Sequence, residues 1–212
     1  MIDTSSLVET MAHLGAHRLI PWVSPAVDDI ERLEKETGGK LPEDYRYFLM
    51  TFGGVSLGDE DFAAKAPISE ACPWGSSVAP GIFSPLDTSR HSIVKELRTF
   101  KGRLPSGVLP ITHDAGGNLI CVDVAGQFPG SVWFWDHEQR WFRDYFAGSF
   151  EEAAQELDAA GIDARRFSVH DIIRGWARLH ADRFDRPSDY MGMYKMAPTF
   201  ADFLRSLHRV PH

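Results

Sequence analysis

Three apolar runs joined by glycine-rich segments restrict the fold of this chain more than any other feature of its sequence. The runs are VLPIT, LICVDV and SVWFW, and the segments between them are HDAGGN and AGQFPG. Runs of β-branched and aromatic residues separated by short turns are typical of neighbouring antiparallel strands. We therefore predict an antiparallel meander over residues 108–135.

The last of the three runs is apolar at every strand position. Successive side chains of a strand point to opposite faces, so Val132 and Phe134 would face one side and Trp133 and Trp135 the other. A strand with two apolar faces is covered on both sides. This run therefore predicts a central strand of the sheet.

Two helices are predicted before the strands. Ser24 and Pro25 are typical of the N-cap and first residue of a helix, which Gly38 and Gly39 would end. In the segment LPEDYRYFLMTFGG, Pro42 would start the second helix. Four apolar residues follow at spacings of three and four, which predicts a core face: Tyr45, Phe48, Leu49 and Phe52.

The second helix would end at Gly53, with that glycine in the left-handed conformation. Residues 53–85 are rich in Gly, Pro, Ala and Ser, and predict loops or short edge strands. A further helix is predicted at about residues 89–100. The C-terminal third is helical by pattern, because SFEEAAQEL and TFADFLRSL begin with a capping residue and carry an acid three positions on, at Glu152 and Asp202.

Polar residues at two strand ends form the one cluster that suggests catalysis. His113 and Asp114 follow the first strand, and Asp136 and His137 follow the third. Imidazoles and carboxylates together would suit a metal or a general acid and base. Consecutive strand residues point to opposite faces, however, so these groups would not all converge. We favour a hydrogen-bonded turn, with a metal-dependent hydrolase as the least favoured alternative.

The other candidate sites are weaker. His13 and His17 have helical spacing for two metal ligands, but Gly15 between them weakens the helix and no third ligand is in reach. Cys72 and Cys121 are too few for a disulfide framework and have no zinc-binding spacing. We therefore predict no metal, no cofactor and no catalytic residue.

The charge is uneven along the chain. The formal net charge is −8, and residues 1–60 alone hold 11 acidic and five basic residues. An acidic N-terminal part argues against direct nucleic-acid binding and suits a basic protein partner. With no leader pattern and no long apolar stretch, we expect a cytoplasmic protein that does not enter the membrane.

The order of these features resembles the SUKH superfamily, also called the Smi/Knr-type domain, over about residues 25–140. In that family an LP-x-x-Y/F-x-x-F/L helix precedes a glycine stop, a glycine-rich hairpin and an aromatic strand that ends near DHE. The motifs fall here on Leu41, Pro42, Tyr45, Phe48, Gly53, Gly54, Asp114, Gly116, Gly117, Asn118, Trp133, Trp135, Asp136, His137 and Glu138.

The resemblance implies an α+β fold in which helices flank a mixed, largely antiparallel sheet. It also implies one domain over residues 1–212, with a motif-bearing core at about 25–140 and a closing helix at about 199–209. Residues at about 145–195 would then be a helical insert or extension. If SFEEAAQEL were the closing helix instead, the domain would be complete before a helical tail.

The resemblance also implies a function without catalysis. Many bacterial members look like immunity proteins that bind and neutralise a toxin domain, often a nuclease or deaminase, so we expect a basic cognate toxin as partner. The alternative is a regulatory or scaffolding module with a cellular partner. An acidic surface complements the basic cleft of a nuclease, and the candidate partner-binding residues are Glu31, Glu34, Asp44, Asp59 and Glu60.

Overall fold

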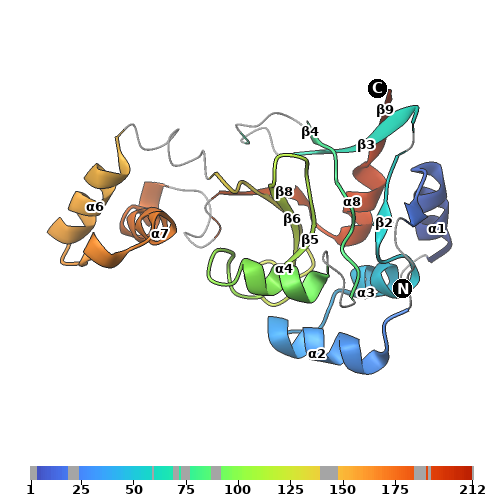
Figure 1. Ribbon diagram of the computed structural model, residues 1–212, viewed down its shortest axis with the longest axis horizontal. Helices are drawn as coiled ribbons and strands as arrows, with labels where there is room; N and C mark the ends of the chain where they lie inside the picture. The colour runs from blue at the N-terminus through green and yellow to red at the C-terminus, as the bar shows by residue number, and fades with distance from the viewer. Residues whose placement is uncertain are drawn as a thin grey trace.

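The computed structural model describes residues 4–18, 24–58, 60–68, 72, 77–86, 92–138, 148–183, 190 and 192–211. Its elements are α1 (Thr4–His13), β1 (His17–Arg18), α2 (Val27–Thr37), α3 (Glu43–Thr51), β2 (Val55–Ser56), β3 (Phe62–Pro67), β4 (Ser77–Val78), α4 (Ile93–Thr99), β5 (Val108–His113), β6 (Leu119–Asp123), β7 (Val132–Trp135), α6 (Phe150–Ala159), η1 (Ala164–Arg166), α7 (Val169–Leu179), η2 (Ala181–Arg183), β8 (Met193–Ala197), α8 (Phe200–Ser206) and β9 (His208–Pro211). In Figure 1 the strands and most helices form one body, with α6 and α7 to one side. The fold is α+β, as predicted.

The largest sheet has the strand order β5-β6-β7-β8. Its first three strands are the predicted meander, and β7 lies between β6 and β8, so the central position predicted for β7 is confirmed. All strand pairs that the structure describes are antiparallel. The parallel part of the expected mixed sheet is therefore not found in these residues.

The two faces of β7 contact two separate hydrophobic clusters. Val132 and Phe134 belong to the main core. Trp133 and Trp135 belong to a smaller cluster on the other face, together with Tyr190. All of these side chains are buried, which confirms the predicted alternation along the strand.

The second helix, α3, supplies the predicted core face. Tyr45, Phe48 and Leu49 are buried, and Phe52 is half-buried against them. The ring of Phe48 lies 5.0 Å from the ring of Phe200, between centroids. The aromatic residues of α3 therefore pack against α8, from the far end of the chain.

The ends of the first two helices differ in detail from the prediction. Helix α2 begins at Val27, two residues after Pro25, because the Asp29 carboxylate accepts a hydrogen bond from the backbone N–H of the N-cap, Ala26. The hydroxyl of Ser24 donates instead to the Met50 carbonyl. Gly38, with a φ of 86°, ends the helix as predicted.

At the other helix, Pro42 is the N-cap and not the first helical residue. The left-handed residue after α3 is Gly54, with a φ of 81°, and not Gly53. The turn comes one residue later because the N–H of Gly54 donates to the Phe83 carbonyl, where β2 begins.

A six-residue strand, β3, occupies a region that the sequence predicted to be loops and short edge strands. It pairs with β9 on one side and with β4 on the other. Between the sheets, the N–H of Phe83 donates to Val55 and the N–H of Ser84 donates to Ile111. Residues 81–84 therefore tie β2 to β5.

Two further helices are shorter than predicted. Helix α4 begins after Ser92, whose hydroxyl accepts the N–H of Lys95, and residues 89–91 of the predicted helix lie outside the described residues. Helix α8 has Thr199 as its N-cap, as predicted, but it ends at Ser206. The chain then forms β9, because pairing with β3 continues from His208.

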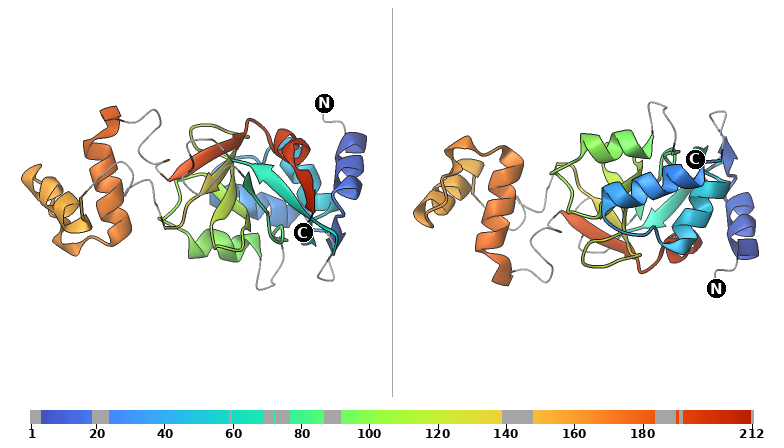
Figure 2. Two further views of the ribbon diagram at one scale, coloured as in Figure 1. Left: turned by 90° about the horizontal axis from the view of Figure 1, so that it is seen from above. Right: turned by 90° about the horizontal axis from the view of Figure 1, so that it is seen from below.

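Helices α6 and α7 pack on each other and lie beyond the end of the main body (Figure 2). Trp176 Nε1 donates to Glu156 Oε2 at 3.0 Å, and His180 Nε2 lies 2.6 Å from the same oxygen. Since β7 and β8 are neighbours, this helical pair is an excursion between two paired strands. The division of the chain into a core and a helical insert stays a prediction. If the helical pair is an insert, it ends before Met193, where β8 begins.

The run SVHDIIRGWARLHADRF suggests one apolar helical stripe, made of Ile172, Ile173, Trp176, Leu179 and Phe184, and helix α7 carries part of it. Ile173 and Trp176 are buried, whereas Leu179 is 40% exposed. Phe184, which continues the stripe, lies outside the described residues. Within the described ranges, the helices are too short or too polar to cross a bilayer.

Candidate functional site

The five acidic residues predicted to bind a partner do not share one surface. Glu31 and Glu60 are exposed, as expected. Glu34 and Asp44 are buried, and Asp59 lies outside the described residues. The expected exposure is therefore wrong for Glu34 and Asp44, and their contacts give the reason.

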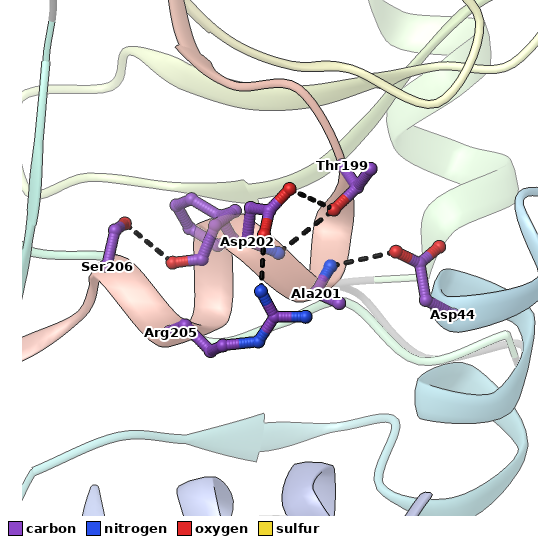
Figure 3. A network of polar contacts seen from close by, with 7 residues as sticks. Asp44, Thr199, Ala201, Asp202, Arg205 and Ser206 are labelled. Carbon is purple, nitrogen blue, oxygen red and sulfur yellow. Dashed lines mark hydrogen bonds and ion pairs between the residues drawn. The ribbon is translucent and has the colours of Figure 1, made fainter. Parts of the chain in front are cut away.

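Asp44 caps a helix. Its Oδ1 accepts the N–H of Tyr45 at 2.8 Å, and its Oδ2 accepts the backbone N–H of Ala201 at 2.8 Å. Ala201 is the second residue of α8, so the carboxylate satisfies an N–H that has no partner inside its own helix. Figure 3 shows Asp44 beside the first turn of α8, where Thr199 and Asp202 hydrogen-bond to each other.

Glu34 holds the turn between α2 and α3. Its carboxylate accepts hydrogen bonds from Lys40 Nζ at 2.5 Å and from the N–H of Leu41 at 3.2 Å. Burial raises the pKa of Glu34, but these two hydrogen bonds and the charges of Lys40 and Arg46 outweigh burial and lower it below its ordinary value. Glu34 is therefore a structural carboxylate that favours its ionised form.

The exposed side of α2 carries both signs of charge. Glu31 is exposed beside Arg32 and Lys35, which are exposed too. Arg32 forms an ion pair with Asp29 at 2.5 Å. This surface is therefore less acidic than the residue count of the first 60 positions suggests, and Glu31 is the predicted site residue that remains on it.

A groove of about 810 Å³ lies between α2 and α4. We call it the α2–α4 groove. It is lined by the apolar side chains of Leu33, Leu86 and Val94, and an ion pair between Arg98 and Glu36 at 3.4 Å borders it. Its size lies in the range of ligand pockets. Sequence reasoning missed the groove because no sequence pattern shows that α2 and α4 are neighbours.

The cluster that suggested catalysis forms a hydrogen-bonded turn at the end of the sheet. The Asp114 carboxylate accepts hydrogen bonds from the N–H of Gly116 and from the backbone N–H and side-chain Nδ2 of Asn118, at 2.8–2.9 Å. Asn118 Oδ1 in turn accepts the N–H of His137 at 3.1 Å and lies 2.8 Å from His137 Nδ1. Because this oxygen can only accept, a hydrogen bond between it and His137 Nδ1 requires the neutral tautomer with a proton on Nδ1, or the protonated ring.

The remaining residues of that cluster have separate contacts. Asp136 is buried and accepts the N–H of Glu138 at 2.9 Å. His113 Nδ1 lies 3.3 Å from the carbonyl oxygen of Asp114. These side chains make local hydrogen bonds at the strand ends. Among the described residues, no group of three or more His, Cys, Asp or Glu could hold a metal ion. Whether the cluster lacks catalysis stays a prediction.

Two histidines and two cysteines were the other candidate site residues. His13 ends α1 and His17 lies in β1, so they do not share a helix face. Cys72 and Cys121 are free and buried. Burial raises the pKa of the Cys121 thiol, which disfavours the reactive thiolate.

Comparison with known proteins gives one family and one curated relative. The family described as the SMI1/KNR4 family (SUKH-1) matches residues 25–156, from α2 into α6. The chain is also similar to the SPbeta prophage-derived uncharacterized protein YokK of Bacillus subtilis (strain 168). The two are 31% identical over 151 residues, which is 65% of this chain and 77% of that protein.

Proposed function

Because the chain belongs to the SMI1/KNR4 family (SUKH-1), which includes toxin immunity proteins, we propose that it neutralises a bacterial toxin domain by binding it directly. Family membership is the observation that carries this proposal. The toxin would be of the nuclease or deaminase type, in keeping with the resemblance of the sequence to bacterial immunity proteins. Neutralisation by binding needs a complementary surface and no catalytic group.

The α2–α4 groove and the exposed side of α2 support binding. The groove combines apolar walls with charged side chains, a mixture that suits a protein partner. Glu31 lies on the same helix and would attract a basic toxin surface. In Figure 1, α2 and β3 lie on opposite sides of the main body, so the exposed Glu60, two residues before β3, would belong to a different contact.

Co-expression tests the proposal directly. A toxin gene beside the gene of this protein would be expressed in a sensitive host with and without the immunity protein. Survival only with both, and a complex that co-purifies, is the expected result. Death despite abundant folded protein would contradict the proposal. Recovery of a cellular component in place of a toxin would favour the regulatory or scaffolding alternative.

A further inference from the structure

A second pocket extends the α2–α4 groove along α4. It has a volume of about 350 Å³ and lies between the last turn of α2 and the segment that joins α4 to β5 (Figure 1). Its apolar lining residues include Leu97, Phe100, Leu104 and Val108. Glu36 and Arg98 line both this pocket and the groove, so the two hollows meet at the ion pair between those side chains. We call the groove and this pocket together the α4 furrow.

The ion pair that separates the two hollows is a weak barrier. Arg98 Nε lies 3.4 Å from Glu36 Oε1, and both side chains are exposed to solvent. Exposed ion pairs contribute little to stability, because water and salt screen them. A carboxylate of a partner can therefore replace Glu36 beside Arg98 at a small cost to the fold.

Basic residues line the furrow on the α4 side. Lys95, Arg98 and Lys101 follow one another at intervals of three along α4 and the turn after it. Lys95 and Lys101 are exposed, and neither has an ion-pair partner among the residues that the structure describes. The charged lining residues of the whole furrow are the basic Arg32, Lys95, Arg98 and Lys101 and the acidic Asp29 and Glu36. The furrow therefore has an excess of positive charge on a chain whose net charge is −8.

We propose that the α4 furrow binds a segment of the toxin that carries carboxylates beside apolar side chains, an inference that rests on the proposed function. Charge complementarity identifies this occupant, because Lys95 and Lys101 would pair with the carboxylates while the apolar walls take the apolar side chains. Nucleic acid fits less well, since Asp29 and Glu36 would repel its phosphates. The acidic segment and the basic surface that would meet Glu31 are different parts of the toxin.

Calorimetric titration of the purified full chain tests the charges, with the toxin domain of the co-expression experiment, in an inactive form, as the probe. Lys95→Glu should weaken binding about two- to tenfold, as expected when one exposed charge interaction is reversed. Lys101→Glu should have a similar effect. Both side chains are exposed, so the urea unfolding midpoints should stay those of the wild type.

Lys195→Glu is the matched control, because it reverses an exposed lysine of β8 that does not line the furrow. Added negative charge strengthens the long-range attraction of a basic toxin, so a general charge effect would tighten binding in all three variants. Weaker binding confined to Lys95→Glu and Lys101→Glu would therefore identify carboxylates at the furrow.

A bulky side chain in the furrow tests whether the toxin enters it. Thr99→Trp places a large ring at an exposed position of the groove lining and should weaken binding at least as much as Lys95→Glu. Gln155→Trp adds the same ring at an exposed position on α6 and should bind as the wild type does. The photo-cross-linker p-benzoylphenylalanine in place of Thr99 should join a toxin peptide that contains Asp or Glu beside apolar residues.

The outcomes separate this inference from the proposed function. A wild-type protein that does not bind the toxin would overturn both. A wild-type protein that binds and protects, while Lys95→Glu and Thr99→Trp bind equally well, would overturn the furrow alone. A cross-linked toxin peptide without carboxylates would also overturn the furrow and leave the proposed function in place.

Discussion

The carboxylate of Asp44 and the backbone N–H of Ala201 form a 2.8 Å hydrogen bond between residues 157 positions apart. Asp44 lies within the part of the chain that the family matches, and Ala201 lies beyond it. The bond therefore fixes the C-terminal helix α8 on α3. The same two helices share the aromatic packing of Phe48 against Phe200.

Asp44→Ala should destabilise the fold by about 1–2 kcal/mol, because the part-buried N–H of Ala201 in the first turn of α8 loses its hydrogen-bond acceptor. Urea unfolding curves measure the change. Glu43→Ala, at an exposed acid in the same turn, is the control and should cost little. Equal midpoints for the two variants would show that the cap contributes nothing.

Phe48→Ala should cost about 3–5 kcal/mol, because it empties a buried site among four aromatic rings. Its ring is 1% exposed and lies 5.2 Å from that of Phe83. Val27→Ala, at a residue that is 54% exposed, provides the comparison. A denaturation midpoint that does not move in Phe48→Ala would reject the core assignment of α3.

Glu34→Gln should reduce stability at neutral pH, and its difference from the wild type should shrink in acid. The pKa of Glu34 is lower in the folded protein than its ordinary value of 4.5. The ionised carboxylate therefore contributes stability above that value, and this contribution is lost as the pH falls through the lower folded pKa. Unfolding free energies at several pH values between 2 and 7 measure it.

Glu31→Gln is the matched control for the pH series, since Glu31 lies on the same helix but is exposed. Its stability should follow that of the wild type at every pH. A constant difference between Glu34→Gln and the wild type down to the lowest pH would contradict the assigned role of the Glu34 carboxylate.

Asn118→Ala should destabilise the fold by about 1–3 kcal/mol, because the Asp114 carboxylate and the backbone N–H of His137 both lose a partner. Thermal or urea unfolding measures the loss.

Metal analysis of protein purified without chelator should find no stoichiometric zinc, manganese or iron. One equivalent of metal that disappears in His137→Ala would restore the hydrolase alternative.

Features that depend on local patterns were predictable from the sequence. The apolar positions of β7 alternate between two clusters because the period of a strand is two, and all four side chains keep to it. The core face of α3 follows in the same way from helical spacing. Helix ends were predicted to within a few residues, since competing hydrogen bonds, such as that of Ser24 to Met50, decide the cap.

Features that depend on contacts between distant segments were not predictable. The run FAAKAP contains few strong strand formers, and it becomes β3 because β4 and β9 supply hydrogen bonds on both sides. Asp44 has the sequence context of an exposed residue near the start of a helix, and only its contact with Ala201 reveals its role. The α2–α4 groove also arises from contacts between distant segments, because its walls come from α2 and α4.

Glu31→Lys should slow association with the cognate toxin by about two- to fivefold at low salt, the size of one exposed charge interaction. The reversal repels a basic partner during encounter, and the effect should weaken at physiological salt, where charges beyond about 8 Å are screened. Stopped-flow or surface-plasmon rates measure it. Reversing the charge of Glu34 or Asp44 would not test the binding surface, because both carboxylates make hydrogen bonds that stabilise the fold.

The control for this experiment is Glu151→Lys, which reverses an exposed acid on α6 while Glu31 stays in place on α2. Figure 2 shows α6 at the far end of the molecule from α2. Both variants change the net charge equally, so a general charge effect would slow them alike. A Glu31→Lys protein that associates as fast as the wild type at low salt would remove α2 from the toxin-binding surface, and a rate loss confined to Glu151→Lys would move that surface to the helical pair.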